Sequence, residues 1–286
     1  MKVLVLGAYG MIGHTVTIYF HEQGHEVTTL TLKPCTLGSH NVVGNATDIN
    51  LIKELMKQDF DAVINCIGVL NEFAEKNKSE AIYLNAYLPH KIASLLDDKK
   101  AKLIQMSTDC VFSGERGRYR EDDVPDGEKF YDKTKAMGEI QDNKNLTFRN
   151  SVVGPDINEA GIGLFNWFMK QNGTIMGFVN TYWNGVTTLT LAKAMEKALI
   201  NDFTGLYHLV PQNKISKYGL CSLFNKHFKG NKIEIIPTEK KAVDKSLIST
   251  RKDFKFIVPS FEAMIEEMKD WILAHKELYK HYDIER

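Results

Sequence analysis

Apolar residues gather in short runs along most of the chain, and polar segments with helical spacing separate several of these runs. The strand-like runs lie at Val3–Leu6, Val27–Leu32, Ala62–Cys66, Leu103–Met106, Leu146–Val153 and Tyr207–Val210. Nearly continuous apolar runs are typical of parallel strands that helices cover on both faces. The pattern therefore predicts an α/β fold of the Rossmann type, with a doubly wound parallel sheet.

A last helix is predicted over about residues 260–276, where apolar side chains recur at helical spacing and Ser260 can serve as the N-cap. One stripe of this helix is formed by Phe261, Met264, Ile265, Met268, Trp271 and Ile272. Such a stripe could be a partner surface, but it is far more typical of packing against a core, and we expect core packing here.

Composition narrows the function classes. Among 286 residues, Lys+Arg and Asp+Glu number 36 each, so the formal charge is zero, and 43% of residues are apolar, enough for a sizeable core. Nucleic-acid and anionic-membrane binders usually carry excess positive charge, so neither partner is expected. No run approaches the roughly 18 apolar residues of a membrane span, and no signal-peptide pattern occurs, so we expect a cytoplasmic protein.

Cysteine and histidine spacing gives no reason to expect a metal or disulfides. Four cysteines, Cys35, Cys66, Cys110 and Cys221, are too widely spaced for a thiolate zinc site or a disulfide framework. The segment from His21 to His25 matches HExxH, but Gly24 is expected to end the helix between them. The two imidazoles would then not share one helix face, and we expect no metal.

A glycine-rich turn follows the first strand. Gly7, Gly10 and Gly13 recur every three residues in GAYGMIG, and a helix is expected to begin near Met11 and Ile12. Glycines allow a tight turn and close approach of a pyrophosphate, whose charge is stabilised by the N–H groups at the helix start. Between a strand and a helix, this spacing predicts a dinucleotide cofactor.

The end of the second strand indicates which dinucleotide. An acid there would bind the ribose 2′-hydroxyl, but this chain has Thr31 and then Lys33. NADPH is therefore favoured, with NADH as the alternative, and Lys33 is the candidate partner of the 2′-phosphate unless it is an ordinary solvated lysine. Asp48, followed by Ile49 at the start of the next helical segment, either contacts the adenine or caps that helix.

Three residues can act on a carbonyl group. Thr108 follows the fourth apolar run, at the sheet edge where doubly wound folds bind ligands, and Tyr131 and Lys135 lie four residues apart on the next helix. Tyr131 would act as the acid–base, Lys135 would bond the nicotinamide ribose, and Thr108 would hold the substrate oxygen. An ammonium about 5 Å from the phenol, at an effective dielectric near 20, would favour phenolate by roughly 3 kcal/mol. On that basis, we expect the pKa of Tyr131 to lie near the working pH.

At this point the motifs resemble a known family. GAYGMIG, NCIGV, Asn85 in IYLNA, MSTDCVFSG, YREDD, YDKTKAMGE and RNSVVGP are similar to the extended short-chain dehydrogenase/reductases, and within them to the dTDP-4-dehydrorhamnose reductase group. The resemblance implies an NAD(P)H-dependent 4-ketoreductase of a nucleotide-linked 6-deoxy sugar, with Thr108, Tyr131 and Lys135 as the catalytic triad. It adds Cys66, Ile67, Gly68 and Asn85 to the cofactor site, and Asp109, Cys110, Glu121, Trp183, Asn184 and Thr187 to the substrate side.

Beyond about Gly154 the sequence becomes richer in glycine and aromatic residues, and this change predicts a division of the chain. Residues 1–155 would form the NAD(P)-binding domain, with 186–222 returning to it, while 156–185 and 223–286 would form a smaller substrate-binding region. A homodimer is also considered. Asp132, where the family usually has glycine, and Lys245, where asparagine is common, leave the identity of the sugar and its nucleotide open.

Alternatives remain. Related dehydratases carry an Asp-Glu pair where this chain has Asp109 and Cys110, so dehydration is not expected. Cys110 resembles the cysteine of GDP-fucose synthase, which keeps an epimerase/reductase in view, although a buried cysteine is the better interpretation. The same fold also serves as a non-catalytic NADP-binding regulatory subunit, as in the β subunit of methionine adenosyltransferase, or as a redox sensor.

Overall fold

The computed structural model describes residues 1–239 and 242–284. Its centre is a seven-stranded sheet in the order β11-β6-β5-β4-β1-β2-β3, in which every neighbouring pair is parallel. These strands are β1 (Lys2–Leu6), β2 (Glu26–Thr31), β3 (His40–Val43), β4 (Ala62–Asn65), β5 (Lys102–Met106), β6 (Leu146–Arg149) and β11 (Gly205–His208). The predicted doubly wound Rossmann-type fold is confirmed.

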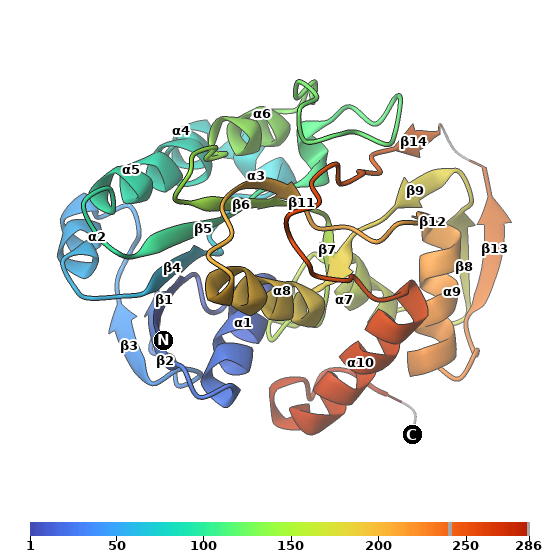
Figure 1. Cartoon of the computed structure of the whole chain (residues 1–286). Coiled ribbons are helices and arrows are strands. Elements are labelled where there is room, and N and C mark those ends of the chain that lie inside the picture. Colours follow the sequence, from blue (N-terminus) through green and yellow to red (C-terminus); the bar gives the residue numbers. More distant parts are fainter. Residues whose placement is uncertain (240–241, 285–286) are drawn as a thin grey trace.

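Helices cover both faces of this sheet (Figure 1). The α-helices are α1 (Met11–Glu22), α2 (Ile49–Met56), α3 (Asn71–Lys76), α4 (Lys78–Ala81), α5 (Leu88–Leu95), α6 (Phe130–Met137), α7 (Leu164–Met169), α8 (Thr188–Ile200), α9 (Lys217–Phe228) and α10 (Phe261–Ala274). A π-helix, η1 (Ile82–Tyr87), and two 3₁₀ turns, η2 (Asp109–Val111) and η3 (Lys276–Leu278), complete them. In the view of Figure 1, α1 and α8 lie on one side of the sheet and α2, α4, α5 and α6 on the other.

The first strand shows why two layers of helices form. Val3 and Val5 belong to the apolar core that includes side chains of α1 and α8, whereas Leu4 and Leu6 belong to the core that includes α2 and α5. All four side chains are fully buried. Since successive strand residues point to opposite faces, an unbroken apolar strand needs cover on both sides.

A smaller region lies beside the sheet. Its strands are β8 (Thr174–Phe178) paired with β13 (Glu234–Thr238), and β9 (Thr181–Trp183) between β12 (Ile215–Ser216) and β14 (Val243–Asp244), while β7 (Val152–Val153) pairs with β10 (Val186–Thr187). Between β10 and β12 the chain returns to the main sheet, where α8 packs against α1 and β11 pairs with β6.

One predicted domain boundary falls inside a helix. The predicted return to the cofactor domain ends at residue 222, which lies inside α9, and α9 packs mainly against α10 and β8 of the smaller region. The last strand of the main sheet, β11, ends at His208, before that boundary. Part of the expected range 223–286 lies outside the described residues, and the division into domains stays a prediction.

The C-terminal helix agrees with its sequence pattern. The Ser260 hydroxyl accepts a hydrogen bond from the Ala263 N–H at 3.2 Å, which confirms the N-cap. The stripe of α10 faces the core: five of its six side chains are buried, and the half-buried Phe261 packs on the Trp183 ring. Core packing is thus confirmed for this helix.

Two further sequence expectations can be compared with the structure. The residues of the HExxH match do not lie on one helix, because α1 ends at Glu22 and Gly24 has a φ of +79°. The His25 ring is hydrogen-bonded to Glu196. Across residues 1–239 and 242–284, no cluster of metal-binding side chains occurs. In the same residues, no helix has the length and apolar character needed to span a bilayer. The cytoplasmic location stays a prediction.

Candidate active site

The glycine-rich turn joins β1 to α1, and its three glycines differ in whether the fold leaves room for a side chain. Gly7 has a φ of +79°, and a Cβ on Gly13 would lie 2.1 Å from the Gly7 carbonyl oxygen, so packing alone requires both residues. A Cβ on Gly10 would meet only that same carbonyl oxygen, at 3.4 Å. Gly10 is the N-cap of α1 and makes no side-chain cap. The free N–H groups of this helix start suit a phosphate group.

A cleft of about 720 Å³ opens beside this turn. Several predicted cofactor residues line it, namely Gly7, Gly10, Thr31, Lys33 and Ile67. Met11 and Ile12 lie half-buried in the first turn of α1. A turn with no room for a side chain at Gly7 and Gly13, an uncapped helix start and a cleft of this size together fit the pyrophosphate and adenosine of a dinucleotide.

At the end of β2, Lys33 is exposed and lines the cleft. The Thr31 hydroxyl donates to the Lys33 carbonyl at 2.7 Å and accepts from the Asn41 amide at 2.8 Å, so it positions the turn that carries Lys33. Asp48 accepts from the N–H groups of Asn50 and Leu51 and caps α2, and it does not line the cleft. Of the two roles considered for Asp48, the structure shows the helix cap. Ile49 is the first residue of α2.

Asn85 connects the cofactor cleft with the catalytic helix. Its carboxamide accepts from the Val69 N–H at 2.8 Å and donates to the Val69 carbonyl at 2.9 Å and to the Thr134 hydroxyl at 3.1 Å. It lies in the π-helix η1, and such bulges often mark functional sites. Asn85 thus holds the strand-end segment of Cys66, Ile67 and Gly68 against α6.

The three predicted catalytic residues come from neighbouring elements. Thr108, Tyr131 and Lys135 are all buried, and α6, which carries Tyr131 and Lys135, packs against η2, whose N-cap is Thr108. The Lys135 ammonium donates to the Met106 carbonyl at 2.6 Å, two residues before Thr108. A Cβ built on Gly68 would lie 4.0 Å from the Lys135 nitrogen, so the lysine also reaches the cofactor side.

The pKa expected for Tyr131 is corrected by the structure. Burial raises the pKa of the Tyr131 phenol well above 10, the nearby Cys110 thiol raises it further, and the hydrogen bond with Thr108 only partly opposes them. Burial also lowers the pKa of Lys135 to about 8. The phenol therefore stays protonated near neutrality, which is the form that donates a proton to a reduced carbonyl.

Asp109 and Cys110 lie next to the triad. Asp109 is half-buried and accepts from the Thr108 hydroxyl at 3.1 Å, and burial raises its pKa while the Lys245 charge opposes the shift. Burial raises the pKa of the Cys110 thiol to about 12, and that of Cys66 likewise to about 12. Thiols with such pKa values are protonated and poor nucleophiles, which supports a packing role for both cysteines.

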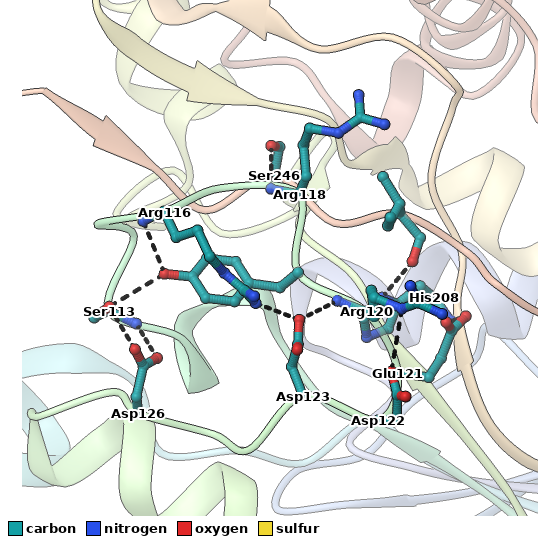
Figure 2. A network of polar contacts seen from close by, with 12 residues as sticks. Ser113, Arg116, Arg118, Arg120, Glu121, Asp122, Asp123, Asp126, His208 and Ser246 are labelled. Carbon is teal, nitrogen blue, oxygen red and sulfur yellow. Dashed lines mark hydrogen bonds and ion pairs between the residues drawn. The ribbon is translucent and has the colours of Figure 1, made fainter.

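Glu121 is predicted to lie on the substrate side, and in the structure its carboxylate is hydrogen-bonded within the fold. Its carboxylate accepts from the His208 N–H, from the Ser249 hydroxyl and from both the N–H and the hydroxyl of Thr250. Figure 2 shows Glu121 beside His208, in a loop held by its own polar contacts such as that between Arg116 and Asp123. Through these hydrogen bonds, Glu121 connects its loop to β11 and to residues 249–250.

The other three predicted substrate residues also have structural partners. The Asn184 carboxamide accepts from the Leu247 N–H at 3.0 Å and donates to its carbonyl at 2.7 Å. Thr187 is the N-cap of α8, and Trp183 is buried against Phe261. Their proximity to a substrate stays a prediction, since each side chain already has a partner within the fold.

Several cleft residues were missed from the sequence. Tyr9, Asn45, Glu80, Ile157 and Asn158 line the same cleft as the glycine turn. Tyr9 stands inside GAYGMIG and Asn45 follows β3, so their positions offered a signal. Ile157 and Asn158 come from a loop about 150 residues away, and nothing in their local pattern points to the cleft.

A family model described as the RmlD substrate binding domain matches residues 1–253. The chain belongs to this family. The predicted resemblance to dTDP-4-dehydrorhamnose reductases is thereby confirmed.

Two relatives illustrate the range of the family. The probable low-salt glycan biosynthesis reductase Agl14 of Haloferax volcanii is 35% identical over 49% of this chain, and the match covers 48% of Agl14, about half its length. The methionine adenosyltransferase 2 subunit beta of Xenopus tropicalis is 30% identical, over 78% of this chain and 71% of its own.

Among solved structures, the dTDP-4-dehydrorhamnose reductase of Bacillus anthracis, in complex with NADP, superposes with a TM-score of 0.78. It is 20% identical, and the match covers 93% of this chain and 98% of that one. At this identity, the superposition shows the shared fold.

Proposed function

We propose that this protein is an NADPH-dependent reductase of a nucleotide-linked 4-keto-6-deoxy sugar, acting in glycan or polysaccharide precursor synthesis. The observation that carries the proposal is the burial of Thr108, Tyr131 and Lys135, with the Lys135 nitrogen close to Gly68. Gly68 follows Ile67, which lines the cleft of about 720 Å³. Membership of the RmlD family and the similarity to a glycan biosynthesis reductase support the sugar-nucleotide class.

The chain's own residues supply the acid and the orientation. Tyr131, kept protonated by burial, donates its proton to the carbonyl oxygen as that oxygen gains charge. Thr108 hydrogen-bonds the same oxygen and fixes its place, and Lys135 bonds the ribose on the cofactor side. A bound nicotinamide supplies the hydride to the carbonyl carbon. Burial of all three side chains keeps bulk water away and strengthens these contacts.

NADPH is proposed over NADH because of the end of β2. Lys33 is exposed there and lines the cleft, and no acid occurs among residues 30–34, which form that wall. A lysine attracts the 2′-phosphate, and a carboxylate at that place would repel it. A dimer and the absence of nucleic-acid partners stay predictions.

The test combines binding and turnover. Purified protein with NADPH and a 4-keto-6-deoxy nucleotide sugar should oxidise the cofactor, and Tyr131→Phe should lower kcat by about 10²–10⁴-fold while the Kd for NADPH changes little. The conservative Tyr19→Phe, a buried tyrosine that bonds Glu196 away from the cleft, serves as the control. Tight NADPH binding without turnover on dTDP-, UDP-, GDP- or CDP-linked ketones would instead support a regulatory subunit, the class to which the Xenopus relative belongs.

A further inference from the structure

The chain's last described residues reach back to the cofactor cleft. Tyr279 and Tyr282 follow α10 and lie beyond the residues matched by the family model, and both side chains are buried. Their hydroxyl groups make buried hydrogen bonds to two separate segments that line the cleft or support its lining.

The loop of residues 155–163, here named the cleft loop, contributes Ile157 and Asn158 to the wall of the cleft that Gly7 and Gly10 also line. A Cβ on Gly163 would lie 3.1 Å from the Met11 sulfur, so the loop approaches the start of α1. Its residues therefore face the place where the pyrophosphate is proposed to bind. Asn158 is exposed, and its carboxamide can donate to a phosphate oxygen.

Tyr282 holds this loop in place. Its hydroxyl accepts from the Asp156 N–H at 2.8 Å and donates to the Asn166 carboxamide oxygen, also at 2.8 Å. The Asn166 amide in turn donates to the carbonyls of Glu159 at 3.0 Å and Gly161 at 2.6 Å. One tyrosine hydroxyl thus anchors both ends of the turn that presents Ile157 and Asn158.

Tyr279 supports the part of the cleft wall formed by Gly10. Its hydroxyl lies 2.8 Å from His14 Nε2, and His14 Nδ1 lies 3.0 Å from the Gly10 carbonyl oxygen. Because a carbonyl can only accept, Nδ1 carries the proton, and Nε2 accepts from Tyr279. The bond from Trp271 Nε1 to the same hydroxyl fixes its direction.

We propose that Tyr282 and Tyr279 are positioning residues for the dinucleotide, with Tyr282 ordering the cleft loop so that Ile157 and Asn158 close over the pyrophosphate. This inference rests on the proposed cofactor site. According to this inference, Tyr279 and Tyr282 raise the affinity for the cofactor although neither side chain lines the cleft.

The experiment measures ligand binding rather than turnover. Calorimetry gives the Kd of NADPH and of 2′-AMP, which occupies only the adenosine end near Lys33, for the full-length wild type and for Tyr282→Phe. Losing the hydroxyl should raise the Kd for NADPH about fivefold and leave that for 2′-AMP unchanged. Tyr19→Phe, which loses a buried hydroxyl bond elsewhere, should lower Tm without changing either Kd.

A double-mutant cycle tests the route of the effect. In a background with Ile157→Ala and Asn158→Ala, adding Tyr282→Phe should cause no further loss of NADPH affinity, because the contacts that it positions are gone. An unchanged NADPH Kd in Tyr282→Phe, or an equal loss in both backgrounds, would overturn the positioning role alone. A wild type that binds 2′-AMP but not NADPH would overturn both this inference and the proposed cofactor.

Discussion

The ammonium of Lys135 is hydrogen-bonded to the carbonyl oxygen of Met106 at 2.6 Å. This contact ties the catalytic helix α6 to the end of β5, two residues before Thr108. Gly68, in the segment that follows the neighbouring β4, lies close to the same nitrogen. One side chain therefore connects the segment proposed to bind the cofactor with the strand end that carries Thr108, the proposed partner of the substrate oxygen.

The same lysine should set the alkaline limit of activity. Burial lowers its pKa to about 8, so the ammonium is lost as pH rises through that value, while the Tyr131 phenol remains protonated. We expect kcat/KM for ketone reduction to fall above about pH 8. Lys135→Arg, which retains its charge at these pH values, should show lower activity but no such fall. A profile in Lys135→Arg with the wild-type alkaline limb would assign the limb to another group.

Lys33 should decide between the two nicotinamide cofactors. Lys33→Glu puts a carboxylate at the cleft wall, and we expect it to weaken NADPH binding by about tenfold and NADH binding much less. Fluorescence titration of both cofactors measures this. Lys255→Glu, an exposed lysine outside the cleft, controls for the change in net charge. Equal losses for the two cofactors would remove Lys33 from the 2′-phosphate site.

Sequence patterns could place the three predicted catalytic residues on neighbouring elements because these positions depend on local structure. Tyr131 and Lys135 share a face through helical spacing, and Thr108 ends a strand whose apolar run is unmistakable. By contrast, β3 was missed, because it is a four-residue edge strand with polar His40 and Asn41 and only half-buried or exposed side chains. Its assignment depends on pairing with β2, which no local pattern reveals.

The properties that could not be predicted depend on partners distant in the sequence. Glu121 and Asn184 are polar residues that fit a sugar site, yet they bind backbone and side-chain groups of residues 247–250. The pKa of Tyr131 was likewise misjudged, because the cost of burying a phenolate comes from packing around the ring, whereas spacing along a helix reveals only the nearby lysine.

A buried ion pair below the triad should be important for stability. Glu139 accepts from Arg149 Nε at 2.8 Å and from the Ser107 hydroxyl, and the side chains of Glu139 and Arg149 are 6% and 1% exposed. Glu139→Gln leaves a buried guanidinium without its counter-charge, and we expect the free energy of unfolding to fall by about 3–5 kcal/mol. Urea denaturation measures it.

The matched control uses a surface pair. Glu277→Gln removes the partner of Lys280, and both side chains of this pair are more than two-thirds exposed. Its effect on the free energy of unfolding should stay below about 1 kcal/mol. If Glu139→Gln behaved like this control, the remaining hydrogen bonds of Arg149, to the Glu121 carbonyl and His208 Nε2, would have to suffice for the buried guanidinium.

His14 should make the fold sensitive to acid. Burial lowers its pKa to about 4 from 6.5, and its two ring nitrogens are engaged by Gly10 and Tyr279 in the neutral form. Between pH 6.5 and 4 the unfolded chain binds the proton and the folded chain does not, so stability falls as pH falls through this window. The single residue contributes about 3 kcal/mol to this loss.

A variant isolates that contribution. His14→Gln keeps a donor and an acceptor but cannot titrate, so its unfolding free energy should change less than that of the wild type between pH 6.5 and 4. His40→Gln, at an exposed position of β3, should retain the wild-type slope. Parallel pH dependence in His14→Gln and the wild type would mean that other buried groups, such as His208, account for the acid sensitivity.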